Sequence, residues 1–117
     1  MKILFVIVLV LSFLTEALAA AALIGGPEGI AAAGQGGQWS MHYGFAALAI
    51  ASVSLWAWSK RTVPAVITVA IGVLLVFHSG LAISLFLAGD QQGGQIIHTV
   101  LAVLLLVLFL QRGKLAG

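Results

Sequence analysis

The sequence predicts an all-α integral membrane protein, a bundle of four transmembrane helices. The chain is 62% hydrophobic and 7% charged, whereas a soluble domain typically carries about 25% charged residues. Its 117 residues divide into apolar stretches that are each about as long as a bilayer crossing requires. We therefore expect a single transmembrane domain over residues 1–117, with helices at about 3–24, 41–58, 63–88 and 95–111.

The first span, residues 3–24, also matches the pattern of a secretory signal. Lys2 supplies the positive charge, Ile3 to Leu14 the apolar core, and Ala17 to Ala19 an A-x-A cleavage site. This segment is therefore either retained as a transmembrane helix or removed as a cleaved signal. The glycine-rich stretch that follows, 25–37, forms either a flexible loop or a short interfacial helix from Pro27 to Ala33.

The second span, residues 41–58, is bordered by tryptophans. Ser40 is a plausible N-cap, and the helix from Trp39 to Trp58 would be about 28 Å long, close to the thickness of the hydrocarbon core. Small residues allow helices in lipid to approach closely. In this span they recur on one face, which we expect to pack against a neighbour: Gly44, Ala47, Ala51 and Ser54.

The third and fourth spans flank a short turn, residues 89–94. Pro64 suits the first turn of the third span because its missing N–H is not needed there. Gly72, Gly80 and Ser84 are the small residues expected to pack against other helices. The fourth span has almost no small or polar residues after Ala102, so we expect its inner half to face lipid or a partner protein.

The distribution of charge predicts the topology. All five basic residues fall on one side of four crossings and Glu28 and Asp90 on the other, so both termini should be cytoplasmic. We expect a multi-pass protein of a bacterial inner membrane, whose partners are the lipid bilayer and other subunits or further copies of itself. The basic residues form no clustered face, so nucleic acid is not an expected partner. They are Lys2, Lys60, Arg61, Arg112 and Lys114.

Each span carries one ionisable side chain: Glu16, His42, His78 or His98. Such groups are costly within a bilayer, so they indicate a functional site. Depth is counted at about 1.5 Å per residue from the outward end of each helix, with Ser40 and Gly94 as the starting points for His42 and His98. Glu16 and His78 then lie about 12–15 Å deep, and His42 and His98 about 3–6 Å deep. The sequence therefore predicts a shallow histidine pair above a deeper glutamate and histidine.

Two histidines on different helices can hold a b-type haem from opposite faces. His42 and His98 match best in depth, whereas His78 with His98 would require a tilted haem. The general plan resembles that of small four-helix membrane cytochrome subunits. We therefore expect an electron-transfer subunit with haem b, working beside a quinone pocket within a larger membrane complex.

Other functions remain open. Three histidines and a carboxylate suit zinc, copper or non-haem iron. Because the four groups lie at two depths, we expect at most three of them to bind one ion. Glu16 and His78 could instead relay protons or line a polar pocket. A structural or assembly subunit without cofactor, and a proton-coupled or metal-ion transporter, are the alternative functions. The chain contains no cysteine and no nucleotide-binding or serine hydrolase motif, so a subunit is expected rather than a stand-alone enzyme.

Overall fold

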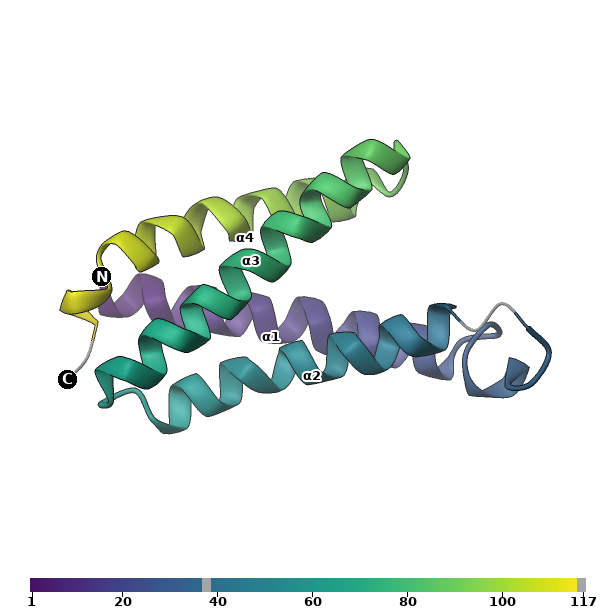
Figure 1. Ribbon diagram of the computed structural model, residues 1–117, viewed down its shortest axis with the longest axis horizontal. Coiled ribbons are helices and arrows are strands. Elements are labelled where there is room, and N and C mark those ends of the chain that lie inside the picture. The colour runs from purple at the N-terminus through teal and green to yellow at the C-terminus, as the bar shows by residue number, and fades with distance from the viewer. Residues whose placement is uncertain (37–38, 116–117) are drawn as a thin grey trace.

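The computed structural model describes residues 1–36 and 39–115, which fold into four long helices and no strand (Figure 1). Each of these helices is long and apolar enough to cross a membrane. The predicted fold class is therefore confirmed. The helices are α1 (Lys2–Gly25), α2 (Trp39–Ser59), α3 (Pro64–Ala88) and α4 (Gln92–Leu110), and two 3-10 turns are η1 (Ile30–Ala32) and η2 (Arg112–Lys114).

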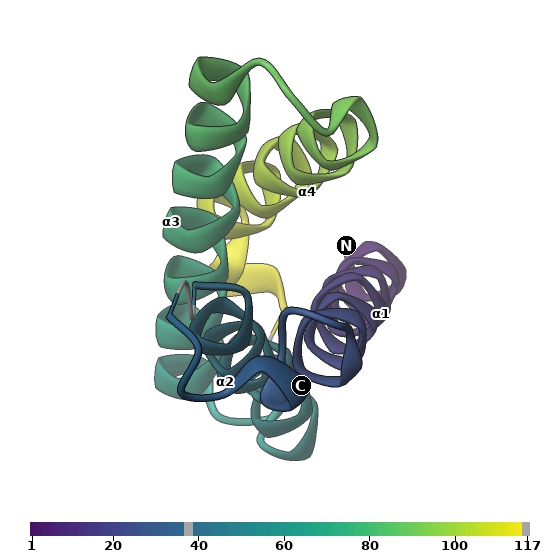
Figure 2. The same cartoon turned by 90° about the vertical axis from the view of Figure 1, so that its right-hand side faces the viewer.

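The helices form two hairpins. α1 packs mainly against α2, and α3 mainly against α4, with fewer contacts between the pairs. The hairpins meet near the end of the bundle that holds both termini, and they diverge toward the loops at the other end (Figures 1 and 2). Lys2 and Arg112, which begin α1 and follow α4, therefore lie at the same end of the bundle.

Helix boundaries differ from the prediction in a few places. Pro64 is the first residue of α3, as expected. Ser40 is not an N-cap, because α2 already begins at Trp39; its hydroxyl instead donates to Glu28 Oε2 at 3.1 Å. The interfacial helix expected from Pro27 to Ala33 is reduced to η1. α4 begins at Gln92, three residues earlier than expected, which places every later residue of α4 deeper in the helix.

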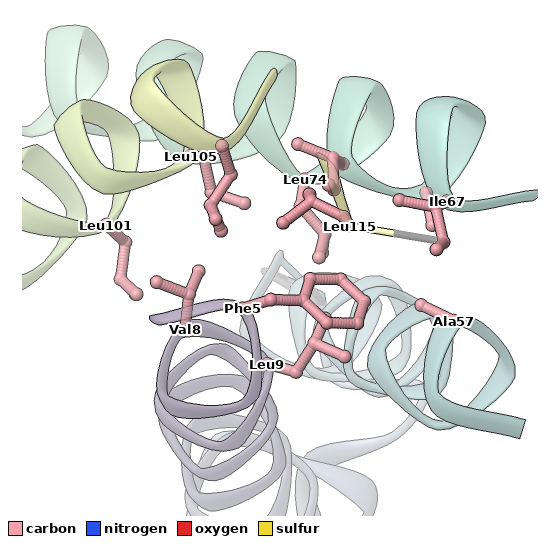
Figure 3. Packing of buried hydrophobic residues seen from close by; sticks show 12 residues of the cluster. Phe5, Val8, Leu9, Ala57, Ile67, Leu74, Leu101, Leu105 and Leu115 are labelled. Carbon is pink, nitrogen blue, oxygen red and sulfur yellow. The ribbon is translucent and has the colours of Figure 1, made fainter. Parts of the chain in front are cut away.

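The apolar core lies where the two hairpins meet (Figure 3). Phe5 and Leu9 of α1 point toward the leucines of the second hairpin. After α4, the turn η2 folds the chain back and buries Leu115 in the same cluster. The core is therefore built from all four helices and the C-terminal turn. Its buried members are Phe5, Val8, Leu9, Ala57, Ile67, Ala70, Ile71, Leu74, Leu101, Leu105, Leu108 and Leu115.

The inner half of α4 belongs to this core. Leu101, Leu105 and Leu108 are fully buried; their spacing of four and three residues places them on one helix face. The expectation that this half faces lipid or a partner was therefore wrong for this face, whereas Val103, Leu106 and Leu110 on the rest of the helix are exposed. A scarcity of small residues prevents a close approach of two backbones, but leucines still pack well between helices that are farther apart.

Replacing Leu105 with alanine should destabilise the protein by about 2 kcal/mol. The cost comes from the cavity and the lost packing contacts. Transfer of the side chain between lipid and core contributes little, because lipid tails solvate leucine as well as the core does. Leu106, which is 47% exposed, provides a matched control on the same helix, and Leu106→Ala should change stability little. Equilibrium unfolding in detergent micelles measures both. Equal effects of the two substitutions would argue against burial of Leu105.

The small residues of α2 line one buried face, as the sequence predicted. Gly44, Ala47, Ala51 and Ser54 are all buried. The equivalent prediction for α3 holds for Gly72, which is half-buried and faces the Phe109 side chain of α4, and was wrong for Gly80 and Ser84, which are exposed. Larger residues form most of the buried face of α3: Ile67, Ala70, Ile71, Leu74, His78 and Ala82.

Gly44 marks the closest approach of α1 and α2. A Cβ atom there would lie 2.7 Å from Ile24 Cγ1 and 3.2 Å from the Ile24 backbone nitrogen. Gly44→Ala should therefore separate the two helices and cost about 1–3 kcal/mol. A Cβ at Gly80 meets nothing within 4 Å, so Gly80→Ala should be neutral or stabilise α3 by up to about 1 kcal/mol. The same unfolding measurement compares the two variants, and a harmless Gly44→Ala would contradict the close packing.

Candidate metal centre

Three ionisable side chains from three helices meet inside the bundle. Glu16 of α1 is 1% exposed, His78 of α3 is fully buried, and His98 of α4 is 6% exposed. Each lies two or three residues from the midpoint of its helix, on the side of the loops that connect α1 to α2 and α3 to α4. The cluster therefore links the two hairpins near mid-depth, beyond the apolar core.

The polar atoms of the cluster are within direct reach of one another. The Nδ1 atoms of His78 and His98 are 2.8 Å apart and share a hydrogen bond. Glu16 Oε1 lies 4.0 Å from His78 Nδ1 and 3.8 Å from His98 Nδ1. Two imidazole nitrogens and one carboxylate oxygen thus surround a common point, and this is a group that can hold a metal ion.

The size of this triangle suits a first-row transition metal. The point equidistant from the corners of a triangle with sides of 2.8, 3.8 and 4.0 Å lies about 2.1 Å from each, close to the ~2.0–2.2 Å of zinc bonds to histidine and carboxylate. Tetrahedral ligands at that bond length are separated by about 3.4 Å. Shifts of about 0.4–0.6 Å in the three separations would therefore produce a regular site, which is within the reach of side-chain torsions.

Glu16 is the buried acidic member of the cluster. Among the described residues, neither carboxylate oxygen has a hydrogen-bond partner, although both are buried. Burial of a carboxylate without compensation is expensive. A cation held between Glu16 and the two imidazoles would supply that compensation.

Aromatic and serine side chains complete the surroundings of the histidines. The Phe77 ring meets both imidazoles edge-on, with centroids 5.2 Å from His78 and 6.4 Å from His98. Ser12 of α1 is fully buried, and its Oγ lies 2.9 Å from His78 Nε2. The sequence analysis missed Ser12. The signal was available, because Ser12 precedes Glu16 by four residues and so shares its helix face.

His42 does not join the cluster. Its side chain is exposed, and the nearby Gly44 packs against Leu23 and Ile24 near the end of α1, about two helix turns beyond Glu16. The predicted grouping into shallow and deep pairs is not what the structure shows. Since α4 begins at Gln92, His98 lies farther into its helix than expected. The packing of the hairpins brings it to Glu16 and His78.

A haem does not fit between the histidines as they are placed. Axial ligands must lie on opposite faces of the macrocycle, whereas the His78 and His98 nitrogens are in direct contact at 2.8 Å. The exposed His42 is not paired with either of them. Haem b therefore stays a prediction from the sequence, to be tested by a visible spectrum.

Comparisons with protein family models, curated proteins and solved structures give no match for this chain. The interpretation of its function therefore depends on the geometry of the Glu16, His78 and His98 cluster, which we call the metal centre.

Proposed function

We propose that the protein is an integral membrane metal-binding protein, which holds one divalent first-row transition metal ion between its two helical hairpins. The observation that carries the proposal is the convergence of His78 Nδ1, His98 Nδ1 and Glu16 Oε1 on one point, with the carboxylate otherwise without a hydrogen-bond partner among the described residues.

The donor set favours one class of ion. Two imidazole nitrogens and one carboxylate oxygen are typical of zinc and of non-haem iron, whereas magnesium and calcium prefer oxygen ligands. Sites that only support a fold usually have four protein ligands, while three leave a coordination position open for an exchangeable ligand. The metal centre therefore favours a chemical or transport role over a purely structural one.

A cofactor-free structural subunit explains part of this arrangement. Hydrogen bonds from Ser12 to His78 and from His78 to His98 can hold α1, α3 and α4 together. The same role gives no reason to bury Glu16, because an apolar residue would pack there without the cost of desolvation. The buried Glu16 carboxyl group, whose oxygens have no hydrogen-bond partner among the described residues, is therefore what favours the metal over the structural alternative.

A metal-ion transporter is the second candidate. Glu16 belongs to one hairpin and both histidines to the other, and the two hairpins share few contacts and diverge toward one end (Figure 1). Separating the hairpins would remove the carboxylate from the imidazoles and release the ion. Zinc uptake by vesicles that contain the protein tests this role, and a bound ion without flux would identify a resident cofactor instead.

Metal analysis of the purified protein tests the proposal. The affinity tag must be removed first, because polyhistidine binds the same ions. Since the chain has no cysteine and three histidines, background binding is limited. We expect close to one zinc, iron or copper ion per chain, or saturable binding of one cobalt ion as a spectroscopic probe. A Soret band on reduction would instead support haem, and absence of both would support the structural alternative.

A further inference from the structure

The buried contact between Ser12 and His78 connects the two hairpins beside the metal centre. We propose that Ser12 is a positioning residue, which accepts the Nε2–H of His78 and so leaves the Nδ1 lone pair of His78 free to bind the metal ion. This inference rests on the proposed function. It assigns a role to a residue that is not itself one of the three ligands.

The direction of this hydrogen bond follows from the role proposed for His78 Nδ1, because a ring nitrogen that binds a metal ion carries no hydrogen. The Ser12 hydroxyl can rotate so that its oxygen faces the ring while its hydrogen points away. Its oxygen then still has lone pairs with which to accept a hydrogen bond. The Ser12 Oγ atom lies 2.9 Å from His78 Nε2 in a fully buried position, so water does not compete for that nitrogen.

The direction matters because a neutral imidazole carries one hydrogen. If Nε2 holds it, Nδ1 is bare and can be a ligand; if Nδ1 holds it, His78 cannot bind the ion through that atom. His78 Nδ1 is the atom that faces His98 Nδ1 and Glu16. Histidine ligands in metal sites generally donate their other N–H to a fixed acceptor, and loss of that acceptor typically weakens binding by about 10–100-fold.

Ser12→Ala should therefore weaken binding of zinc by about 10–100-fold while the stoichiometry stays at one ion per chain. Ser54→Ala is the matched control. Ser54 is also a buried serine in a membrane-spanning helix, but its hydroxyl has no hydrogen-bond partner among the described residues, so the affinity should not change. Ser12→Thr, which keeps the hydroxyl, should restore most of the affinity.

Nitrogen NMR of the His78 side chain in metal-free protein provides a second readout, which is the nitrogen that carries the ring hydrogen. A serine that only packs against His78 would leave this position unchanged. We expect the hydrogen on Nε2 in the natural protein and a mixture of both tautomers in Ser12→Ala. A hydrogen on Nδ1 in the natural protein would overturn the inference, as would unchanged zinc affinity in Ser12→Ala. The NMR result needs no metal and no variant, so failure of zinc binding by the natural protein would refute the proposed function separately.

Discussion

Replacing His98 with alanine is expected to weaken zinc binding by between about a hundredfold and a thousandfold. Zinc sites with four protein ligands bind with about 10–16 kcal/mol near neutral pH, so each ligand contributes about 2.5–4 kcal/mol on average. His98 offers one of the three atoms that we propose as ligands. Isothermal titration with zinc in detergent micelles, or competition with a chelating dye, measures the change.

His42→Ala is the matched control for this experiment. It removes the same side chain from an exposed position on α2, and zinc affinity should remain that of the natural protein. Equal losses in both variants would point to adventitious binding by histidines. A large loss in His42→Ala alone would instead return His42 to the site, as the sequence analysis expected.

Replacing Glu16 with leucine is expected to have opposite effects on function and stability. The variant should lose high-affinity zinc binding, because it removes the carboxylate ligand. In the presence of a chelator, however, it should be more stable than the natural protein by about 1–3 kcal/mol. A buried carboxyl group that has no hydrogen-bond partner among residues 1–36 and 39–115 is replaced by an apolar side chain of similar size. Equilibrium unfolding in micelles, with and without zinc, measures both effects.

The sign of the stability change separates the metal-binding function from the structural alternative. If Glu16 serves to hold the helices together, then Glu16→Leu should lower the stability of the metal-free protein. Glu28→Leu provides the control: Glu28 is exposed and accepts a hydrogen bond from Ser40, so its loss should destabilise slightly whether or not zinc is present. A stabilising effect at both positions would reflect added apolar surface rather than relief of a buried charge.

Much of the fold could be predicted because it depends on local properties of the chain. Hydropathy and length located the membrane-compatible helices to within a few residues, and the recurrence of Gly44, Ala47, Ala51 and Ser54 predicted the packed face of α2. In α3 the same argument selected Gly80 and Ser84, which are exposed. The apolar pattern of α3 is nearly uniform, so small residues alone do not reveal which face is buried.

The sequence predicted the three ionisable residues of the candidate site, but not which of the predicted residues lie together. Glu16, His78 and His98 were all among the predicted site residues. Glu16 and His78 were expected to lie together, and Glu16 Oε1 is 4.0 Å from His78 Nδ1. The pairing of His42 with His98 is not a spatial grouping in the structure, because His42 is exposed on α2 and His98 is buried with Glu16 and His78. The depth of His98 was also counted from Gly94, whereas α4 begins at Gln92. Depth along a helix also says nothing about the direction in which a side chain points.

By itself, the sequence determined that this protein has four membrane-compatible helices and which ionisable side chains lie within them, because composition and hydrophobic length act locally. Only the tertiary structure decided that Glu16, His78 and His98 meet and that Ser12 joins them. Those contacts depend on the rotation of each helix against its neighbours. Ser12 and His78 are 66 residues apart in the chain, and packing between the hairpins, rather than any local pattern, brings them together.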